Sequence, residues 1–335
     1  MDGWTAMLVF VLVLAVAFDY TNGFHDTANS IATSVATRAL SPGQAILMAT
    51  AFNFIGAFAG TAVAKTIGSG LVDDKTTTQT IVAAALIGAI SWNMITWWLG
   101  LPSSSSHALI GGLLGATIIG VGTQALIPSG IVNKVLIPMF TSPLLGFSIA
   151  FALMLSLYWI FRSSKRKKTS GRFRKVQVGS AAFMAFAHGS NDAQKTMGII
   201  TLALFSAGVI KEVTVPTWVI IVSATALSAG TAVGGWRIMK TMGQRVAKLE
   251  PVHGFAAETT GASILFATSQ LGMPVSTTQV ISSAIMGVGS SQGVRHVRWG
   301  VARRILIAWV LTLPGAGILA ALAWVVLNGL GNLLT

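Results

Sequence analysis

Two polar stretches, DYTNGFHDTANS at residues 19–30 and AHGSNDAQKT at residues 187–196, lie in the middle of long apolar segments. The first of these segments spans about residues 4–40, and a continuous helix of that length would be about 55 Å long. The hydrocarbon core of a membrane is only ~30 Å thick. Irregular backbone is tolerated at that depth where it lines a protein interior or a water cavity. We therefore predict that the backbone breaks in both stretches, the first near Gly23, and that both face a central site.

The two stretches are copies of each other, and a second pair of motifs follows them in the same order. Residues 22–26 align with residues 188–192 at an offset of 166, and residues 99–115 align with residues 271–287 at an offset of 172. Interrupted segments at corresponding positions of two halves are typical of inverted repeats around a transport site near the membrane midplane. We assign residues 1–161 to the first repeat, residues 162–175 to a basic linker and residues 176–335 to the second repeat.

The composition indicates a membrane protein. Hydrophobic residues make up 53% of the 335 residues and charged residues only 9%, whereas soluble domains carry about 25% charged residues. The chain has no cysteine, which excludes disulfides and thiolate metal sites. We predict an all-α polytopic membrane protein with two inverted-topology repeats, broken or re-entrant helices and about 10–12 transmembrane segments. The ten crossing units that we count lie at about residues 4–40, 43–68, 78–99, 103–123, 135–161, 176–208, 215–235, 253–271, 275–292 and 299–330.

The net charge of +13 is concentrated in loops. Eight of the 22 Lys and Arg residues lie between Arg162 and Lys175, and the clusters at residues 237–248 and 295–304 fall on the same side of the membrane. This bias predicts a multi-pass protein of the plasma (inner) membrane with a cytoplasmic linker and both termini outside. No aromatic residues interleave the basic loops, so we expect no nucleic-acid partner. Residues 4–18 lack a preceding basic residue and a cleavage site, and we expect a retained helix there.

The segments LPSSSSHALIGG and MPVSTTQVISS each combine a proline, a run of hydroxyl side chains and an apolar continuation. Proline followed by Ser or Thr is typical of a helix start. Such a start offers free backbone N–H groups and partial positive charge, and it therefore binds anions. Ordinary helix capping is the alternative interpretation of either segment alone. Because the two segments are related by the repeat, we predict one oxyanion site formed by Ser104, Ser105, Ser106, Thr277 and Thr278.

Asp26 and Asp192 lie inside the two polar stretches, where an unpaired carboxylate is costly and needs a cation, a proton or a basic partner. Asn29 follows Asp26 by one helical turn, and Lys195 takes the equivalent place after Asp192. Oxygen ligands of this kind favour hard cations such as Na+ over transition metals. Lys195 neutralises Asp192 or contacts a bound anion. A structural polar network is the alternative role for the two aspartates.

Several other polar residues are left without an assigned role. His25 is a candidate proton carrier, although hydrogen bonding to backbone is the simpler interpretation. Glu258 is open to a support or an ion-pathway role, and Asp19 is given none. No zinc-binding HExxH spacing and no nucleotide-binding P-loop is present, so we expect no transition metal, no cofactor and no ATP hydrolysis. A membrane-embedded serine hydrolase is disfavoured because the serine run lies at a helix start and the second copy has Gln279 where the first has His107.

These motifs resemble those of the inorganic phosphate transporter (PiT) family, the sodium- or proton-coupled phosphate symporters. The resemblance rests on GFHDTANSIAT at residues 23–33, AHGSNDAQKTMGI at residues 187–199 and the two Ser/Thr-rich segments. It implies an inverted-repeat fold, inorganic phosphate as substrate and a cation gradient as the driving force. By position, it implies a sodium-binding set of His25, Asp26, Asn29, Asn191 and Asp192. It adds Gln194 and Lys195 to the phosphate-binding residues.

The chain departs from the sodium-coupled pattern of that family at His25, commonly Asn, and at Gln194-Lys195, commonly Ala-Asn. These departures leave the coupling ion and its stoichiometry open. The leading hypothesis is a secondary active transporter that imports phosphate with Na+ by alternating access, in contact with the lipid bilayer. Proton-coupled or metal-phosphate symport, and sulfate as the substrate, are the alternatives. The sequence leaves a homo-oligomer open.

Overall fold

The computed structural model describes residues 5–334, and this range is all-helical without a β-strand. The first half contains α1 (Ala6–Ala36), α2 (Pro42–Gly56), α3 (Ala62–Ser69), α4 (Gln79–Leu99), α5 (Ser105–Gly120), η1 (Thr123–Ala125), α6 (Pro128–Gly130), η2 (Ile131–Leu136) and α7 (Ile137–Ile160). The second half contains α8 (Arg166–Ser206), α9 (Thr217–Val233), α10 (Trp236–Lys240), η3 (Thr241–Arg245), α11 (Pro251–Gln270), α12 (Thr277–Ser290), η4 (Val294–His296) and α13 (Trp299–Leu334).

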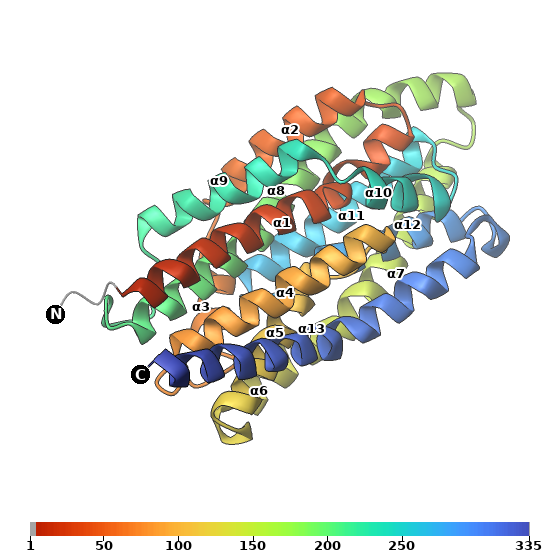
Figure 1. Ribbon diagram of the computed structural model, residues 1–335. Coiled ribbons are helices and arrows are strands. Elements are labelled where there is room, and N and C mark those ends of the chain that lie inside the picture. Colours follow the sequence, from red (N-terminus) through yellow and green to blue (C-terminus); the bar gives the residue numbers. More distant parts are fainter. Residues whose placement is uncertain (1–4, 335) are drawn as a thin grey trace.

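The order of elements in the first half recurs in the second half. Helices α1, α2, α4 and α5 correspond to α8, α9, α11 and α12, and the short turns η1 and η4 follow at matching places. Single backbone bridges, Val72 with Leu126 and Ala247 with Val297, also recur at corresponding positions. In Figure 1, α1 begins at the left-hand end of the bundle, where α13 ends, whereas α8 begins at the opposite end. This arrangement is what an inverted repeat requires.

The prediction that the backbone breaks in the two polar stretches is wrong. Helix α1 is continuous over 31 residues, and α8 is continuous over 41 residues. Gly23 serves close packing instead, because a Cβ atom there would clash with the backbone of Leu227 and Gly230 in α9. The polar side chains face neighbouring helices rather than lipid, so an intact helix carries them without exposing polar groups to hydrocarbon. Residue 4, at the start of the predicted first segment, lies outside the described residues.

The breaks occur at other places, and they too are related by the repeat. Chain reversals at Gly100 and Gly272 precede α5 and α12, and both glycines have φ +65°, the left-handed conformation that favours glycine. A further break lies in the second half, where the chain bends by 60° between α9 and the α10–η3 segment. The predicted linker is largely helical, because α8 begins at Arg166.

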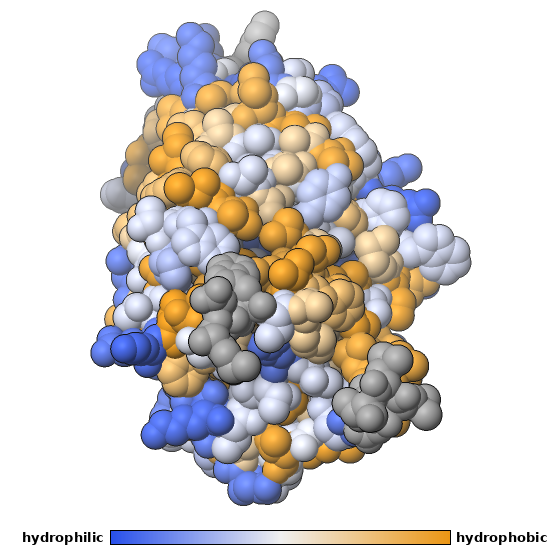
Figure 2. Space-filling view, turned by 60° about the vertical axis from the view of Figure 1, so that its left-hand side comes forward, coloured by the Kyte–Doolittle hydropathy of each residue, from blue (hydrophilic) through white to orange (hydrophobic). Residues whose placement is uncertain are grey.

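Apolar side chains cover much of the outside. Leu47, Trp98 and Phe140 are each more than two-thirds exposed, and Figure 2 shows apolar residues over the middle of the visible face with hydrophilic residues towards its edges. Among residues 5–334, four helical segments are long and apolar enough to cross a membrane: α1, α4, α6–α7 and α13. The bent pair of α9 with α10–η3 makes a fifth. Helices α8 and α11 do not pass this test; both carry buried polar residues, Asp192 on α8 and Glu258 on α11. The protein is an integral membrane protein.

Candidate functional site

The twelve predicted site residues are all buried, each with at most 2% of its side chain exposed. They come from four places: the middle of α1, the middle of α8 and the first turns of α5 and α12. Contacts between these four places join the two halves of the chain. Residues far apart in the sequence therefore lie together in the protein interior.

The two helix starts are capped in the same way. Ser104 accepts a hydrogen bond from the His107 backbone N–H at 3.1 Å, and Ser276 accepts one from the Gln279 N–H at 3.2 Å. The first backbone bonds within the helices are donated by Ala108 and by residue 280. Residues 105, 106, 277 and 278 come before these first donors in the chain. Their backbone N–H groups therefore have no partner within their own helix. Four such donors beside hydroxyl side chains suit a tetrahedral anion.

On the α1 side, Asp26 is surrounded by a histidine and two hydroxyl groups. Nδ1 of His25 lies 2.6 Å from its carboxylate, and the hydroxyls of Thr277 and Thr278 lie 3.5 Å away. The side-chain amide of Asn29 donates to Thr277 at 3.1 Å and to Thr278 at 2.9 Å. The predicted cation residues of α1 are therefore fastened to the predicted anion residues of α12.

On the α8 side, Asp192 has two potentially cationic partners. Lys195 donates to Asp192 Oδ1, and Nε2 of His188 lies 3.1 Å from Asp192 Oδ2. Lys195 also donates to the hydroxyl of Ser106 at the start of α5. The repeat is thus unsymmetrical in its chemistry, because the lysine has no counterpart beside Asp26.

Asp26, His188 and Asp192 offer ligand atoms that all lie within 4.8 Å of one another. Two buried carboxylates at this separation repel each other strongly unless positive charge lies between or beside them. The arrangement therefore suits a cation. The sequence alone assigned no role to His188, although it lies four residues before Asp192 and thus on the same helical face.

Not every predicted residue joins this cluster. Gln194 accepts a hydrogen bond from the Val63 N–H at 2.8 Å and donates to the Ser190 carbonyl at 2.6 Å, so its amide fastens α3 to α8. Ser104 uses its hydroxyl as a helix cap. Both polar atoms of Asn191 are buried without a hydrogen-bond partner among the described residues, which leaves them available to a ligand.

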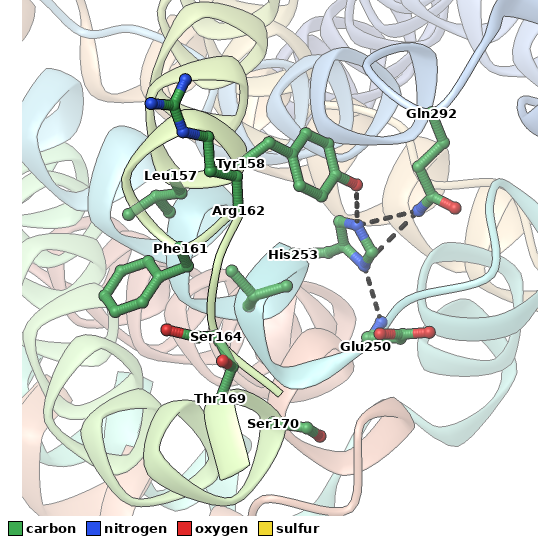
Figure 3. A pocket seen from close by; sticks show the side chains of 11 residues that line it. Leu157, Tyr158, Phe161, Arg162, Ser164, Thr169, Ser170, Glu250, His253 and Gln292 are labelled. Atoms are coloured by element: carbon green, nitrogen blue, oxygen red, sulfur yellow. Dashed lines mark hydrogen bonds between the residues drawn. The ribbon is translucent and has the colours of Figure 1, made fainter. Parts of the chain in front are cut away.

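A separate cavity of about 320 Å³ lies where the linker between the halves meets the start of α11 (Figure 3). Nε2 of His253 lies 2.8 Å from the Tyr158 hydroxyl and 2.8 Å from the Gln292 amide, and its Nδ1 accepts from the Glu250 N–H at 3.0 Å. This cavity contains none of the predicted site residues.

Comparison with known proteins identifies the family of this chain. The sequence model of the "Phosphate transporter family" matches residues 22–172 and 161–320. A "probable low-affinity inorganic phosphate transporter" of Bacillus subtilis (strain 168) is 47% identical, over 98% of this chain and 99% of that protein. A protein of the same description from Rhizobium meliloti (strain 1021) is 47% identical, over 95% of this chain and 96% of that protein.

A solved structure described as "The sodium-dependent phosphate transporter" has a TM-score of 0.89, with 25% sequence identity, over 97% of this chain and 99% of that one. These relatives are transporters, which removes the serine hydrolase as an alternative. The chain is a transporter rather than an enzyme, and it belongs to the phosphate transporter family.

Proposed function

We propose that this protein imports inorganic phosphate by symport with Na+, through alternating access around the buried site. The phosphate is held by the first turns of α5 and α12, at Ser105, Ser106, Thr277 and Thr278. The cation is held by Asp26 and Asn29, with Asp192 and Asn191 on the opposite helix. The basic linker faces the cytoplasm, and both chain ends face outside.

One contact supports the coupling more than any other. The hydroxyl of Thr277 lies 3.5 Å from Asp26 and 3.4 Å from Asp192, so a residue of the anion site touches both carboxylates. Phosphate next to two carboxylates is repelled unless a cation accompanies it. A cation bound there in turn strengthens phosphate binding, because coupling between two ligands is reciprocal. That mutual dependence is what a symporter needs.

The test is phosphate uptake into proteoliposomes with an inward Na+ gradient or an inward H+ gradient, imposed one at a time. We expect the Na+ gradient alone to drive accumulation above the external phosphate concentration. Uptake that merely equilibrates phosphate under both gradients would show a passive pathway and contradict the proposal. Excess sulfate that suppresses phosphate uptake when arsenate does not would contradict phosphate as the substrate.

Proton coupling is the second candidate, and the contact between His25 and Asp26 favours it. Nδ1 of His25 lies 2.6 Å from Asp26 Oδ1, and its Nε2 lies 3.1 Å from Thr96. Histidine is a common proton carrier in proteins, and the Asp26 carboxylate lies within hydrogen-bonding distance of this ring. Accumulation driven by the H+ gradient alone, and lost in His25→Asn, identifies this mode.

A further inference from the structure

The ammonium group of Lys195 is enclosed by protein oxygens. It donates to Asp192 Oδ1 and Ser106 Oγ, and the backbone oxygen of Val275 accepts from it at 3.3 Å. The side chain is 1% exposed. A carboxylate, a hydroxyl and a backbone carbonyl are the ligands that a hard metal cation takes in proteins. The amine thus occupies surroundings that would suit a bound cation.

The three contacts also use all the hydrogen-bonding capacity of the ammonium. A lysine has three N–H donors and no acceptor, and three oxygens already receive them. No donor is left over for a phosphate oxygen. This argues against the direct phosphate contact that the motif comparison implies for Lys195.

The repeat supplies an equivalent place in which the lysine is absent. The offset of 166 relates Asp192 to Asp26 and Lys195 to Asn29, and the offset of 172 relates Ser106 to Thr278. Thr278 lies 3.5 Å from Asp26, and the Asn29 amide donates to Thr278 at 2.9 Å. Within residues 5–334, the only ion-pair partner of Asp26 is His25. In this place Asp26 and Thr278 supply the carboxylate and the hydroxyl, and no lysine pairs with Asp26 among the described residues.

We propose that Lys195 is a resident cation that takes the place of one of two coupling cations. The inference rests on the proposed function, because it assigns the cation sites of the symporter. Of two equivalent sites, the one at Asp192 is filled by the amine, and the one at Asp26 takes the mobile ion. The chain therefore moves one coupling cation with each phosphate, where two equivalent sites without the lysine would move two.

The experiment replaces Lys195 by the residue of the other half. Lys195→Asn leaves Asp192, Ser106 and the Val275 carbonyl in place and opens the second site to Na+. We expect its phosphate uptake to fall by about tenfold at low Na+ and to recover as Na+ is raised. The Hill coefficient for Na+ should rise by about one relative to the wild type, whichever cation drives the wild type. Lys195→Met fills the space without charge, and added Na+ should not restore its uptake.

Lys65→Asn is the matched control, because Lys65 is an exposed lysine of α3 outside the site. It should leave the Na+ dependence unchanged. A raised phosphate KM in Lys195→Asn, with an unchanged Na+ dependence, would overturn the inference and place Lys195 on the anion. Loss of uptake at every Na+ concentration in a folded Lys195→Asn protein would overturn it as well.

A second measurement needs no variant. In the wild type, a known phosphate gradient is opposed by a cation gradient until net phosphate flux is zero. The ratio of the two gradients at that point gives the number of cations moved per phosphate, and we expect one. A ratio of two or more contradicts the resident cation but leaves the symporter intact. A wild-type protein that does not accumulate phosphate under any cation gradient contradicts the proposed function itself.

Discussion

The side-chain amide of Asn29 donates to the hydroxyl of Thr278 at 2.9 Å, across 249 positions of the chain. The bond ties the middle of α1 in the first half to the first turn of α12 in the second half. A residue predicted to bind the cation thereby positions a residue predicted to bind the anion. The bond thus joins the proposed cation site to the proposed anion site.

Ser105→Ala should weaken phosphate binding more than cation binding. The Ser105 hydroxyl lies at the first position of α5, 3.5 Å from His25 Nδ1, and it touches neither Asp26 nor Asp192 among the described contacts. Loss of one hydrogen bond to a charged ligand costs about 1.5–3 kcal/mol. We expect the KM for phosphate to rise at least about tenfold, with less than a threefold change in half-saturating Na+.

Initial rates in proteoliposomes, with each ligand varied in turn, measure both constants. Ser156→Ala, at an exposed serine of α7 that donates to the Ala152 carbonyl, is the control and should change neither. Equal changes in both constants would instead assign Ser105 to the cation site.

Asp26→Asn and Asp192→Asn should both abolish coupled uptake, but only the second should greatly reduce stability. Asp192→Asn leaves the ammonium of Lys195 buried without its carboxylate, and an uncompensated buried charge costs about 3–5 kcal/mol. Among the described residues, Asp26 pairs with His25 alone, so its loss leaves no buried lysine or arginine without a partner. Thermal unfolding in detergent should therefore show a much lower midpoint for Asp192→Asn than for Asp26→Asn.

The double variant Asp192→Asn/Lys195→Asn removes both charges and should regain most of the lost stability. Such recovery is the signature of a coupled pair. Additive destabilisation by the two changes would mean that the lysine and the aspartate do not interact as the structure shows.

The sequence predicted which segments meet better than it predicted the backbone around them. Composition and the repeated motifs located the four segments that meet, because two copies of the same polar pattern in apolar surroundings rarely arise by chance. The predicted breaks were misplaced because a long apolar segment with a polar middle at Gly23 indicates only that the polar side chains avoid lipid. A continuous helix surrounded by other helices meets that requirement equally well. The contacts of Lys195 and the position of His188 depend on how α5, α8 and α12 pack against one another. The residue pattern within a single segment does not predict that packing.

Gly23→Ala should destabilise the fold. A Cβ atom at Gly23 would clash with the Leu227 carbonyl oxygen and with the backbone at Gly230, and backbone cannot move aside cheaply. Overpacking of this kind costs about 1–3 kcal/mol or more. Gly179→Ala is the matched control in the middle of α8, because no atom lies within 4 Å of its Cβ position.

Removing a glycine from an open helical position stabilises a helix by about 0.5–1 kcal/mol. The two glycine variants should therefore shift the unfolding midpoint in opposite directions. A stabilised Gly23→Ala protein would mean that α1 and α9 do not pack as closely as the structure shows.

Glu258 tests whether a buried carboxyl supports the fold or carries an ion. It accepts from Thr33 at 2.6 Å, from Gln177 at 2.9 Å and from Ser180 at 2.5 Å, and it thereby joins α11 to α1 and α8. In Glu258→Gln, the side-chain amide oxygen still accepts from Thr33 and Gln177. The amide N–H₂ can donate to the Ser180 hydroxyl, whose proton can turn towards the Gln177 carbonyl 3.1 Å away. All partners are thus retained without a charge.

We therefore expect Glu258→Gln to unfold within about 1 kcal/mol of the wild type and to keep phosphate uptake. Glu258→Ala removes the acceptor of the buried Thr33 hydroxyl and Gln177 amide, and each such loss costs about 1–3 kcal/mol. Its unfolding midpoint should fall far below that of Glu258→Gln. Loss of uptake in a stably folded Glu258→Gln protein would reject the supporting role, because the charge or the proton of the carboxyl would then be required for transport.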